Sequence, residues 1–148
     1  MIIRALMVQD RMVWEDLFDA YAAFYKTTVG ADAKAEVWEW IFAGVPEFWC
    51  DLALDDQGQV VGMMQYQLMH RSLSGQKVCY LSDLYVRPEV RGGGIGRALI
   101  DHVIDFARTR EISNVRWLTQ EFNYAGRRLY DSYQPKSDFI LYSVPVGG

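Results

Sequence analysis

The chain has 148 residues, a formal charge of −4 and an apolar content of 51%, the balance of one soluble globular domain with a substantial core. The negative charge argues against nucleic acid as a partner, because nucleic acid selects basic surfaces. No apolar run approaches the ~20 residues of a membrane span, and the first residues lack the pattern of a signal peptide. We therefore expect a single domain over residues 1–148, no membrane contact and a cytoplasmic location.

The two cysteines, Cys50 and Cys79, stand far apart and lack the CxxC spacing of a zinc site. Both lie in apolar runs that read as strands. We interpret them as small buried hydrophobic residues and expect no metal.

The N-terminal part predicts a strand followed by two helices. Residues 2–7 form a short strand-like run, and Asp10 stands at the N-cap of a helix that runs to about Tyr25. Gly30 breaks this pattern. A second helix over residues 33–42 is expected to end near Gly44 and Pro46.

Three strands follow. Residues 48–54 and 60–70 flank the turn Asp55-Asp56-Gln57-Gly58, which is typical of a hairpin because glycine tolerates positive φ. A polar loop over residues 71–76 precedes a third strand at 78–86, which is rich in β-branched and aromatic residues.

The C-terminal part predicts a long amphipathic helix over residues 94–110, a strand at 115–119, a helix at 124–133 and a final strand at 139–144. The segment 78–119 reads as a strand–helix–strand crossover between parallel strands. The whole chain is expected to be a mixed α/β sheet with helices on both faces.

The most informative segment is a glycine-rich loop that follows a strand and opens a helix. It consists of Arg91, Gly92, Gly93, Gly94, Ile95, Gly96 and Arg97. Such a loop places backbone N–H groups at the positive end of a helix dipole, and glycines remove the Cβ atoms that would keep a phosphate away. The two arginines add charge that pairs with phosphate oxygens. We expect a pyrophosphate in this loop.

Two common nucleotide-binding patterns fail here. A Walker loop needs Gly-Lys-Ser/Thr at its end, but Gly96 precedes Arg97-Ala98. The dinucleotide pattern GxGxxG fails in both registers, because its third glycine position holds Arg97 or Leu99. The pattern that fits is Arg-x-x-Gly-x-Gly. The alternative is a turn that merely joins a strand to a helix.

Three segments resemble one known family. Residues 80–92 and the glycines after them are similar to motif A of the GNAT acetyltransferase superfamily, and residues 123–131 (NYAGRRLYD) are similar to its motif B. Residues 137–142 resemble the branch that includes histone and polyamine acetyltransferases. The resemblance implies an α/β fold with a mostly antiparallel sheet, a central parallel pair that splays into a V, and acetyl-coenzyme A as cosubstrate.

The resemblance also implies the rest of the binding site. Backbone groups of Leu84, Tyr85 and Val86 would pair with the pantetheine arm. Asn123 would contact the coenzyme, and Tyr130 would lie near the thioester sulfur. The sequence departs from the family pattern after Tyr130, where Gln134-Pro135 replaces the usual Gly-Phe pair.

Acetyl transfer to an amine requires proton transfers. A lysine-like amine has a pKa near ~10.4, so at pH 7 its neutral form costs roughly 4.6 kcal/mol. Tyr130 is the candidate acid for the leaving thiol. Asp83 is the first candidate base and Glu121 the second, although a carboxylate at either position could instead only bind the ammonium group. Strand alternation places Asp83 and Tyr85 on one face and Leu84 on the other.

Several other residues have two interpretations. We interpret His70 and His102 as surface or packing residues, with catalysis as the alternative. The pair Arg127-Arg128 could reach the ribose phosphate or form a solvated helix face. The aromatic residues that could wall the acceptor slot, or could simply fill the core, are Tyr21, Trp38, Trp40 and Trp49.

The sequence thus predicts an N-acetyltransferase that acts on a primary amine of a polyamine, an amino compound or a protein lysine. The alternative is a non-catalytic acyl-coenzyme A-binding module, which would not need Tyr130 or a carboxylate at position 83. The apolar strand expected at residues 139–144 would leave a sheet edge exposed, so we also expect a homodimer.

Overall fold

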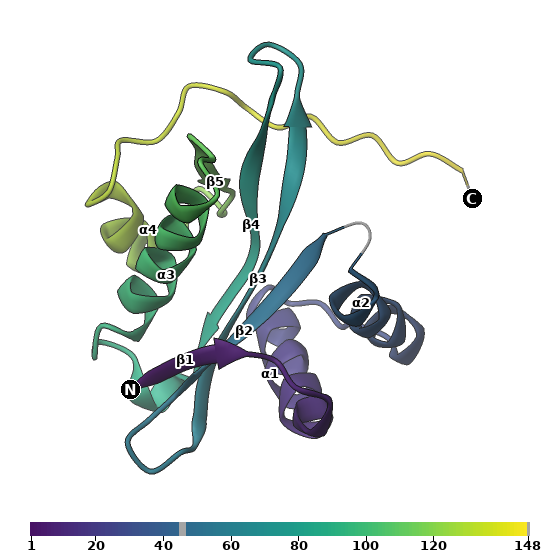
Figure 1. Ribbon diagram of the computed structural model, residues 1–148, viewed down its shortest axis with the longest axis vertical. Coiled ribbons are helices and arrows are strands. Elements are labelled where there is room, and N and C mark those ends of the chain that lie inside the picture. Colours follow the sequence, from purple (N-terminus) through teal and green to yellow (C-terminus); the bar gives the residue numbers. More distant parts are fainter. Residues whose placement is uncertain (45–46, 148) are drawn as a thin grey trace. The chain divides into compact units, whose positions relative to one another are not determined.

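Five strands form one sheet within the first 117 residues (Figure 1). The computed structural model describes residues 1–44 and 47–147 and divides the chain into two units, Met1–Trp117 and the residues from Leu118 onwards. The strands are β1 (Ile2–Ala5), β2 (Phe48–Leu54), β3 (Val60–Arg71), β4 (Gln76–Val86) and β5 (Val115–Trp117). They lie in sequence order, antiparallel from β1 to β4, and β5 is parallel to β4.

Helices cover both faces of this sheet, as the sequence predicts. The α-helices are α1 (Arg11–Phe24), α2 (Ala31–Ala43), α3 (Ile95–Thr109) and, in the second unit, α4 (Tyr124–Asp131); the short helices η1 (Val8–Asp10) and η2 (Pro88–Val90) precede α1 and α3. α1 and α2 lie on one side of the sheet and α3 on the other (Figure 1). One core cluster, which includes Trp14, Leu17 and Met63, fills the α1/α2 side, and a second cluster, which includes Leu99 and Val103, lies beneath α3.

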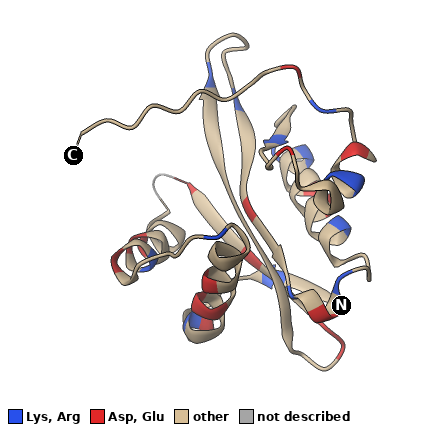
Figure 2. Ribbon diagram, turned by 180° about the vertical axis from the view of Figure 1, so that it is seen from behind, with Lys and Arg blue, Asp and Glu red and all other residues tan. Residues whose placement is uncertain are grey.

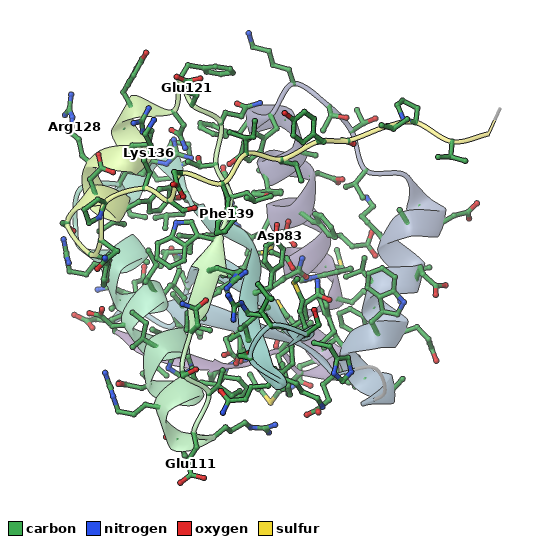
Figure 3. The ribbon with its side chains drawn as sticks, turned by 90° about the horizontal axis from the view of Figure 1, so that it is seen from above. Asp83, Glu111, Glu121, Arg128, Lys136 and Phe139 are labelled. Atoms are coloured by element: carbon green, nitrogen blue, oxygen red, sulfur yellow. The ribbon has the colours of Figure 1, made fainter. Side chains whose placement is uncertain are left out.

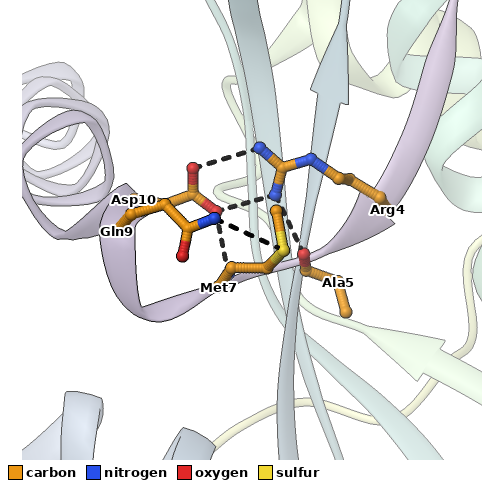
Figure 4. Close-up of polar contacts among 5 residues, drawn as sticks. All are labelled: Arg4, Ala5, Met7, Gln9 and Asp10. Carbon is orange, nitrogen blue, oxygen red and sulfur yellow. Dashed lines mark hydrogen bonds and ion pairs between the residues drawn. The ribbon is translucent and has the colours of Figure 1, made fainter.

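An ion pair fixes the connection between β1 and α1 (Figure 4). Arg4 contacts both carboxylate oxygens of Asp10 at 2.7 and 3.1 Å, and the backbone N–H of Met7 donates to the same carboxylate at 2.8 Å. Asp10 therefore occupies the predicted N-cap position of α1. Its carboxylate, however, accepts hydrogen bonds from Arg4 and Met7, which precede the helix, and does not cap α1. The hydrogen bond from Arg4 lowers the pKa of Asp10.

The helices α1 and α2 end as the sequence predicts within two residues. Lys26 takes a positive φ of 59° just after α1, and Gly44 takes a φ of 77° after α2. Gly30 is not the breaker of α1 but the N-cap of α2. Pro46 lies outside the described residues. Lys34 on α2 joins the two helices, because its ammonium lies 2.9 Å from Asp19 on the acidic outer side of α1 (Figure 2).

The predicted strands between residues 48 and 86 are confirmed. The turn between β2 and β3 has Gly58 at a φ of 79°, and the Asp55 carboxylate accepts the N–H groups of Gln57 and Gln59, each at 2.9 Å. β3 and β4 both extend further into the predicted 71–76 loop, so that only a short turn remains.

A β-bulge interrupts β4 at Ser82. Gln65 of β3 faces Asp83, but its neighbour Tyr66 faces Leu81, so Ser82 is an extra residue on β4. Leu81 packs beneath α3, and after the bulge Leu84 does so as well, whereas Tyr85 packs with the α1/α2 cluster. The bulge therefore reverses which residues of β4 face each side of the sheet.

The prediction of a final strand over residues 139–144 is wrong for the described chain. No described residue after Trp117 forms a strand, and the side chains of Phe139, Leu141 and Tyr142 are at least 72% exposed. The described part of the second unit offers this apolar run no strand with which to pair. The parallel pair β4–β5 consequently stands at the end of the described sheet, and β5 is two residues shorter than predicted.

None of the helices in the described ranges combines the length and apolarity of a membrane span.

Candidate active site

The glycine-rich loop leads directly into the first turn of α3. Gly92 and Gly94 have φ values of 88° and 83°, a conformation that favours glycine. Gly94 is the N-cap of α3 and provides no side chain to cap it. The first helical hydrogen bond of α3 runs from Ala98 to Gly94 at 3.0 Å, so the N–H groups of Ile95 and Gly96 precede the helical ladder and point out of its positive end.

The space beside this helix end is open. A Cβ atom placed on Gly92 or Gly94 would meet no protein atom within 4 Å. Gly93, between them, has only the Val90 carbonyl oxygen at 3.4 Å. The loop is therefore a concave stretch of backbone with N–H donors and no side chains, which matches the requirements of a phosphate group.

Gly62 allows α3 to pack closely on β3 and β4. A Cβ atom at this position would lie 2.9 Å from the Tyr85 carbonyl oxygen, 3.4 Å from Leu99 Cδ1 and 3.6 Å from Ile95 Cγ2. Because Gly62 has no side chain, the start of α3 can lie directly against the end of β4. The glycine-rich loop therefore lies beside the strand that carries Asp83.

Arg91 does not extend into the loop. Its Nε donates to the Val86 carbonyl oxygen at 2.9 Å, and its guanidinium lies over the rings of Phe24 and Tyr85 at 5.4 and 5.5 Å. Arg91 thereby joins the loop to both β4 and the end of α1. Arg97, the other predicted phosphate partner, lies exposed in the first turn of α3.

The last residues of β4 have no strand partner on one edge within the described first unit. β5 pairs with β4 only as far as Leu81, opposite Trp117. Arg87 donates its N–H to Val61 at 2.9 Å, and by antiparallel alternation the peptide groups of Tyr85 also face β3. Those of Leu84 and Val86 point to the opposite edge, where the sequence predicts pairing with an extended ligand and where the Val86 carbonyl oxygen already accepts Arg91 Nε. The Tyr85 ring lies buried in the α1/α2 cluster.

Asp83 lies on β4 immediately after the bulge, on the α1/α2 side of the sheet (Figure 3). Its carboxylate accepts a hydrogen bond from Gln65 Nε2 at 2.8 Å and another from the Tyr21 hydroxyl of α1. Burial raises the pKa of Asp83, and the two hydrogen bonds oppose this shift. A half-buried carboxylate with a raised pKa suits a group that takes up and releases a proton.

Sequence reasoning missed Gln65 and Trp14 as members of this site. Gln65 is fully buried, and its Oε1 accepts the indole N–H of Trp14 at 2.9 Å. The available signal was a single amide in the apolar run from Val60 to Met64 and Tyr66, because a buried polar side chain requires partners. Tyr21 was considered only as a wall or core residue, and it contacts Asp83 directly.

The second unit carries the remaining predicted residues. Asn123 is the N-cap of α4, where its Oδ1 accepts the Gly126 N–H at 3.2 Å and its Nδ2 donates to Thr119 at 2.9 Å. Gly126 leaves room for this side chain, because a Cβ there would lie 2.6 Å from the Asn123 amide nitrogen and the amide would have to shift. Asn123 therefore has a clear structural role in starting the helix that carries Tyr130.

Tyr130 lies half-buried near the end of α4. Glu121, expected at the end of a strand, is an exposed loop residue, because β5 stops at Trp117 (Figure 3). Arg127 donates to the Glu121 carbonyl oxygen and lies over the Tyr124 ring, and Arg128 is exposed. The structure thus gathers Asp83, the open β4 edge and the glycine-rich loop in the first unit, and Asn123, Glu121 and Tyr130 in the second.

The histidines, Trp38, Trp49 and the two cysteines lie away from Asp83 or pack in the core clusters. His102 hydrogen-bonds to buried Asp51 beneath α3, and His70 is exposed at the end of β3. Trp49 packs in the cluster beneath α3, away from the face of Asp83, whereas Trp38 packs on the α1/α2 cluster. Cys50 and Cys79 are buried as predicted, and burial raises the pKa of Cys79 to about 11. The residues that the structure describes contain no group of three metal-ligating side chains.

Comparison with known proteins agrees with this geometry. The sequence model of the acetyltransferase (GNAT) family matches residues 14–133. The chain is 28% identical to D-amino-acid N-acetyltransferase HPA3 of Saccharomyces cerevisiae over 95% of this chain and 88% of that protein. It is 35% identical to thialysine N-epsilon-acetyltransferase of Bos taurus over 48% of this chain and 41% of that protein. Among solved structures, a probable acetyltransferase superimposes with a TM-score of 0.86 at 24% identity, over 100% of this chain and 99% of that chain.

Proposed function

The chain belongs to the acetyltransferase (GNAT) family and is an acyltransferase, and from this premise we propose that it transfers an acetyl group from acetyl-coenzyme A to a primary amine. The observation that carries the proposal is the position of Asp83 on β4, directly before a strand edge that leads to the open glycine-rich loop. The strand β4 thus carries the half-buried Asp83 carboxylate and, directly after it, the edge that would bind an extended phosphorylated ligand.

The described residues fit acetyl-coenzyme A. The N–H groups of Ile95 and Gly96 and the side-chain-free stretch from Gly92 to Gly94 would hold the pyrophosphate at the helix end. The outward peptide groups of Leu84 and the N–H of Val86 would hold the pantetheine arm as a short added strand, while the Val86 carbonyl oxygen accepts Arg91 Nε. When bound there, the cosubstrate supplies the acetyl group as a reactive thioester.

Two side chains would manage the protons. Asp83 would accept a proton from the incoming ammonium group, and its raised pKa brings it nearer to that task than an exposed aspartate. Tyr130 would donate a proton to the departing sulfur. The new N–C bond forms as the C–S bond breaks, so no covalent bond to the protein is needed, and positioning of the two substrates provides much of the rate.

The proposed acceptor is a small amine or a lysine side chain. The yeast and bovine relatives are named for their action on a D-amino acid and on thialysine, both of which carry an amine. The aromatic groups of Tyr21 and Phe24 on α1 flank the Asp83 side of the sheet and supply apolar surface for the carbon skeleton of such an acceptor.

A thermal-shift measurement with acetyl-coenzyme A, run beside a thiol-release assay over polyamines, amino acids of both hands and lysine peptides, tests the proposal. A ligand at 100 times its Kd stabilises by about 2.7 kcal/mol, so binding will raise the melting temperature visibly. We expect stabilisation together with thiol release for one acceptor class. Stabilisation without release from any acceptor would support the non-catalytic binding module, and no stabilisation would overturn the assignment of the loop.

Assembly forms a second part of the proposal. The family match at residues 14–133 crosses the boundary at Trp117, which supports one functional domain made from both units. The exposed apolar run of Phe139, Ile140, Leu141 and Tyr142 supports a homodimer in which this segment covers a partner. Light scattering that finds only a 17.1 kDa species would contradict the dimer.

A further inference from the structure

A buried chain of hydrogen bonds runs from α1 through β3 to Asp83. The indole N–H of Trp14 donates to Gln65 Oε1 at 2.9 Å, and Gln65 Nε2 donates to Asp83 Oδ2 at 2.8 Å. Trp14 and Gln65 are both 0% exposed, so the bond between them is shielded from water, whereas the bond to Asp83 is part-buried. Gln65 and Asp83 are direct cross-strand partners, which fixes the distance between them.

The chemistry of tryptophan determines which way the Gln65 amide points. An indole N–H can only donate, so it requires the oxygen of the amide and leaves the NH₂ group for Asp83. If the amide turned around, the buried indole would face another donor and lose its hydrogen bond to Gln65. The NH₂ group is therefore always presented to Asp83, and a donor at that position favours the ionised carboxylate.

We propose that Trp14 and Gln65 are positioning residues that orient the Asp83 carboxylate and keep it ionised, and thus ready to accept a proton. The inference rests on the proposed function, in which Asp83 takes a proton from the amine. Trp14 acts on Asp83 through Gln65, whose orientation its indole N–H sets.

The surroundings of Asp83 make this role measurable. The titratable groups that interact with it within the described residues are Tyr21 from α1, Cys50 from β2 and Tyr80 from β4 itself. Burial raises the pKa values of Cys50 and Tyr80, so both are neutral where a carboxylate titrates. Burial also raises the pKa of Asp83, and the bond from Gln65 is the foremost contact that opposes this rise.

The first experiment measures the Asp83 pKa directly, by a ¹³C NMR titration of the carboxyl carbon in the ligand-free protein. Gln65→Leu removes the donor and should raise this pKa by up to ~1 pH unit, equal to a tenfold change in the protonation equilibrium. Trp14→Phe keeps an aromatic ring, releases the amide to turn, and should shift the pKa in the same direction by less. Leu17→Val, in the same core cluster, is the control for lost packing.

The second experiment measures kcat and the pH dependence of kcat/KM for these variants with one acceptor, so that the titration of the acceptor amine is common to all. Gln65→Leu should lower kcat roughly tenfold, leave the KM for acetyl-coenzyme A unchanged and move the acid limb to higher pH. Adding Trp14→Phe to Gln65→Leu should have no further effect on the acid limb, because the indole acts only through the amide. Leu17→Val should lower stability and leave the acid limb in place.

The outcomes separate the two proposals. If Asp83→Asn retains full turnover, the base assignment fails, and the catalytic role of the hydrogen-bonded chain fails with it. If Asp83→Asn is inactive but Gln65→Leu keeps the original Asp83 pKa and acid limb, the chain is only structural and the inference is overturned. Additive effects of Trp14→Phe and Gln65→Leu on the acid limb would also overturn it.

Discussion

His102 Nε2 lies 3.1 Å from Asp51 Oδ2, beneath α3 and on the opposite side of the sheet from Asp83. Asp51 is buried and also accepts the hydroxyl of Tyr66 at 2.6 Å. The hydrogen bond to Asp51 raises the pKa of His102. A raised folded-state pKa stabilises the protein below the unfolded pKa of ~6.5, and this contribution disappears as the pH rises through the folded pKa.

We therefore expect His102→Asn to lower the urea midpoint most at about pH 5.5 and least above the folded pKa. The chain has two histidines, so their NMR signals can be followed individually. The exposed His70, at the end of β3, provides the comparison variant His70→Asn. A constant difference between wild type and His102→Asn at all pH values would contradict the expectation.

Gly94→Ala should weaken acetyl-coenzyme A binding. The residue has a φ of 83°, and its Cβ would project into the open space beside the helix end. Gly75→Ala is a matched control, because Gly75 has a φ of 64°, equally open surroundings and a place in the β3–β4 turn. Both changes should cost about 1–2 kcal/mol of stability. Calorimetric titration should show a loss of affinity for Gly94→Ala alone.

Gly62→Ala should destabilise the whole first unit. Its Cβ would lie 2.9 Å from a backbone oxygen that cannot rotate away, so α3 or β4 must shift. We expect a loss of about 1–3 kcal/mol in urea unfolding. Gly30→Ala is the comparison, because its Cβ would meet nothing within 4 Å at an ordinary φ of −73°. Equal stability for the two variants would mean that the packing at Gly62 adjusts without cost.

Asp83→Asn should reduce kcat by a factor of roughly 10² or more at neutral pH, the usual effect of losing a general base. The variant keeps the size of the side chain, so the melting shift with acetyl-coenzyme A should persist. Glu121→Gln, at an exposed loop position, should change kcat by less than about twofold. The reverse ranking would assign the base to Glu121.

Asn123→Asp separates the two roles of Asn123. The carboxylate still caps α4 through an oxygen, whereas the amide donor to Thr119 is lost. We expect nearly unchanged stability for Asn123→Asp and a loss of about 1 kcal/mol for Asn123→Ala. If acetyl-coenzyme A affinity falls in Asn123→Asp while stability holds, the amide contacts the cosubstrate as well as building the helix.

Local sequence signals predicted the elements of the fold well. The glycine-rich loop, the Asp55–Gly58 turn and the amphipathic α3 depend on neighbouring residues, and each was found within two positions. The prediction of the final strand was wrong because a strand depends on a partner, which a run of apolar residues does not reveal. Asp10 gives a second example. Its carboxylate was expected to cap α1 but binds Arg4 of β1, a partner that the local sequence around the helix does not reveal.

The face of Asp83 was predicted correctly, but its surroundings were not. Alternation from Asp83 to Tyr85 holds because both follow the bulge, and counting from Leu81 would have placed Asp83 beneath α3. The contacts of Asp83 with Gln65 and Tyr21 come from residues 18 and 62 positions away, which no local pattern connects. Charge and hydrogen-bond partners across a sheet follow from register, and register is a property of the folded chain.

The extra residue at Ser82 also restricts how this segment can vary. Every residue from Asp83 to Val86 owes its side of the sheet to that single insertion, and the outward peptide groups of Leu84 and Val86 depend on the same count. Loss of Ser82 from the chain would exchange the two sides at once, sending the carboxylate of Asp83 beneath α3 and turning the wrong peptide groups outward. Related sequences can therefore substitute residues in this segment, but they must keep its length, because the length sets which side chains face each side of the sheet.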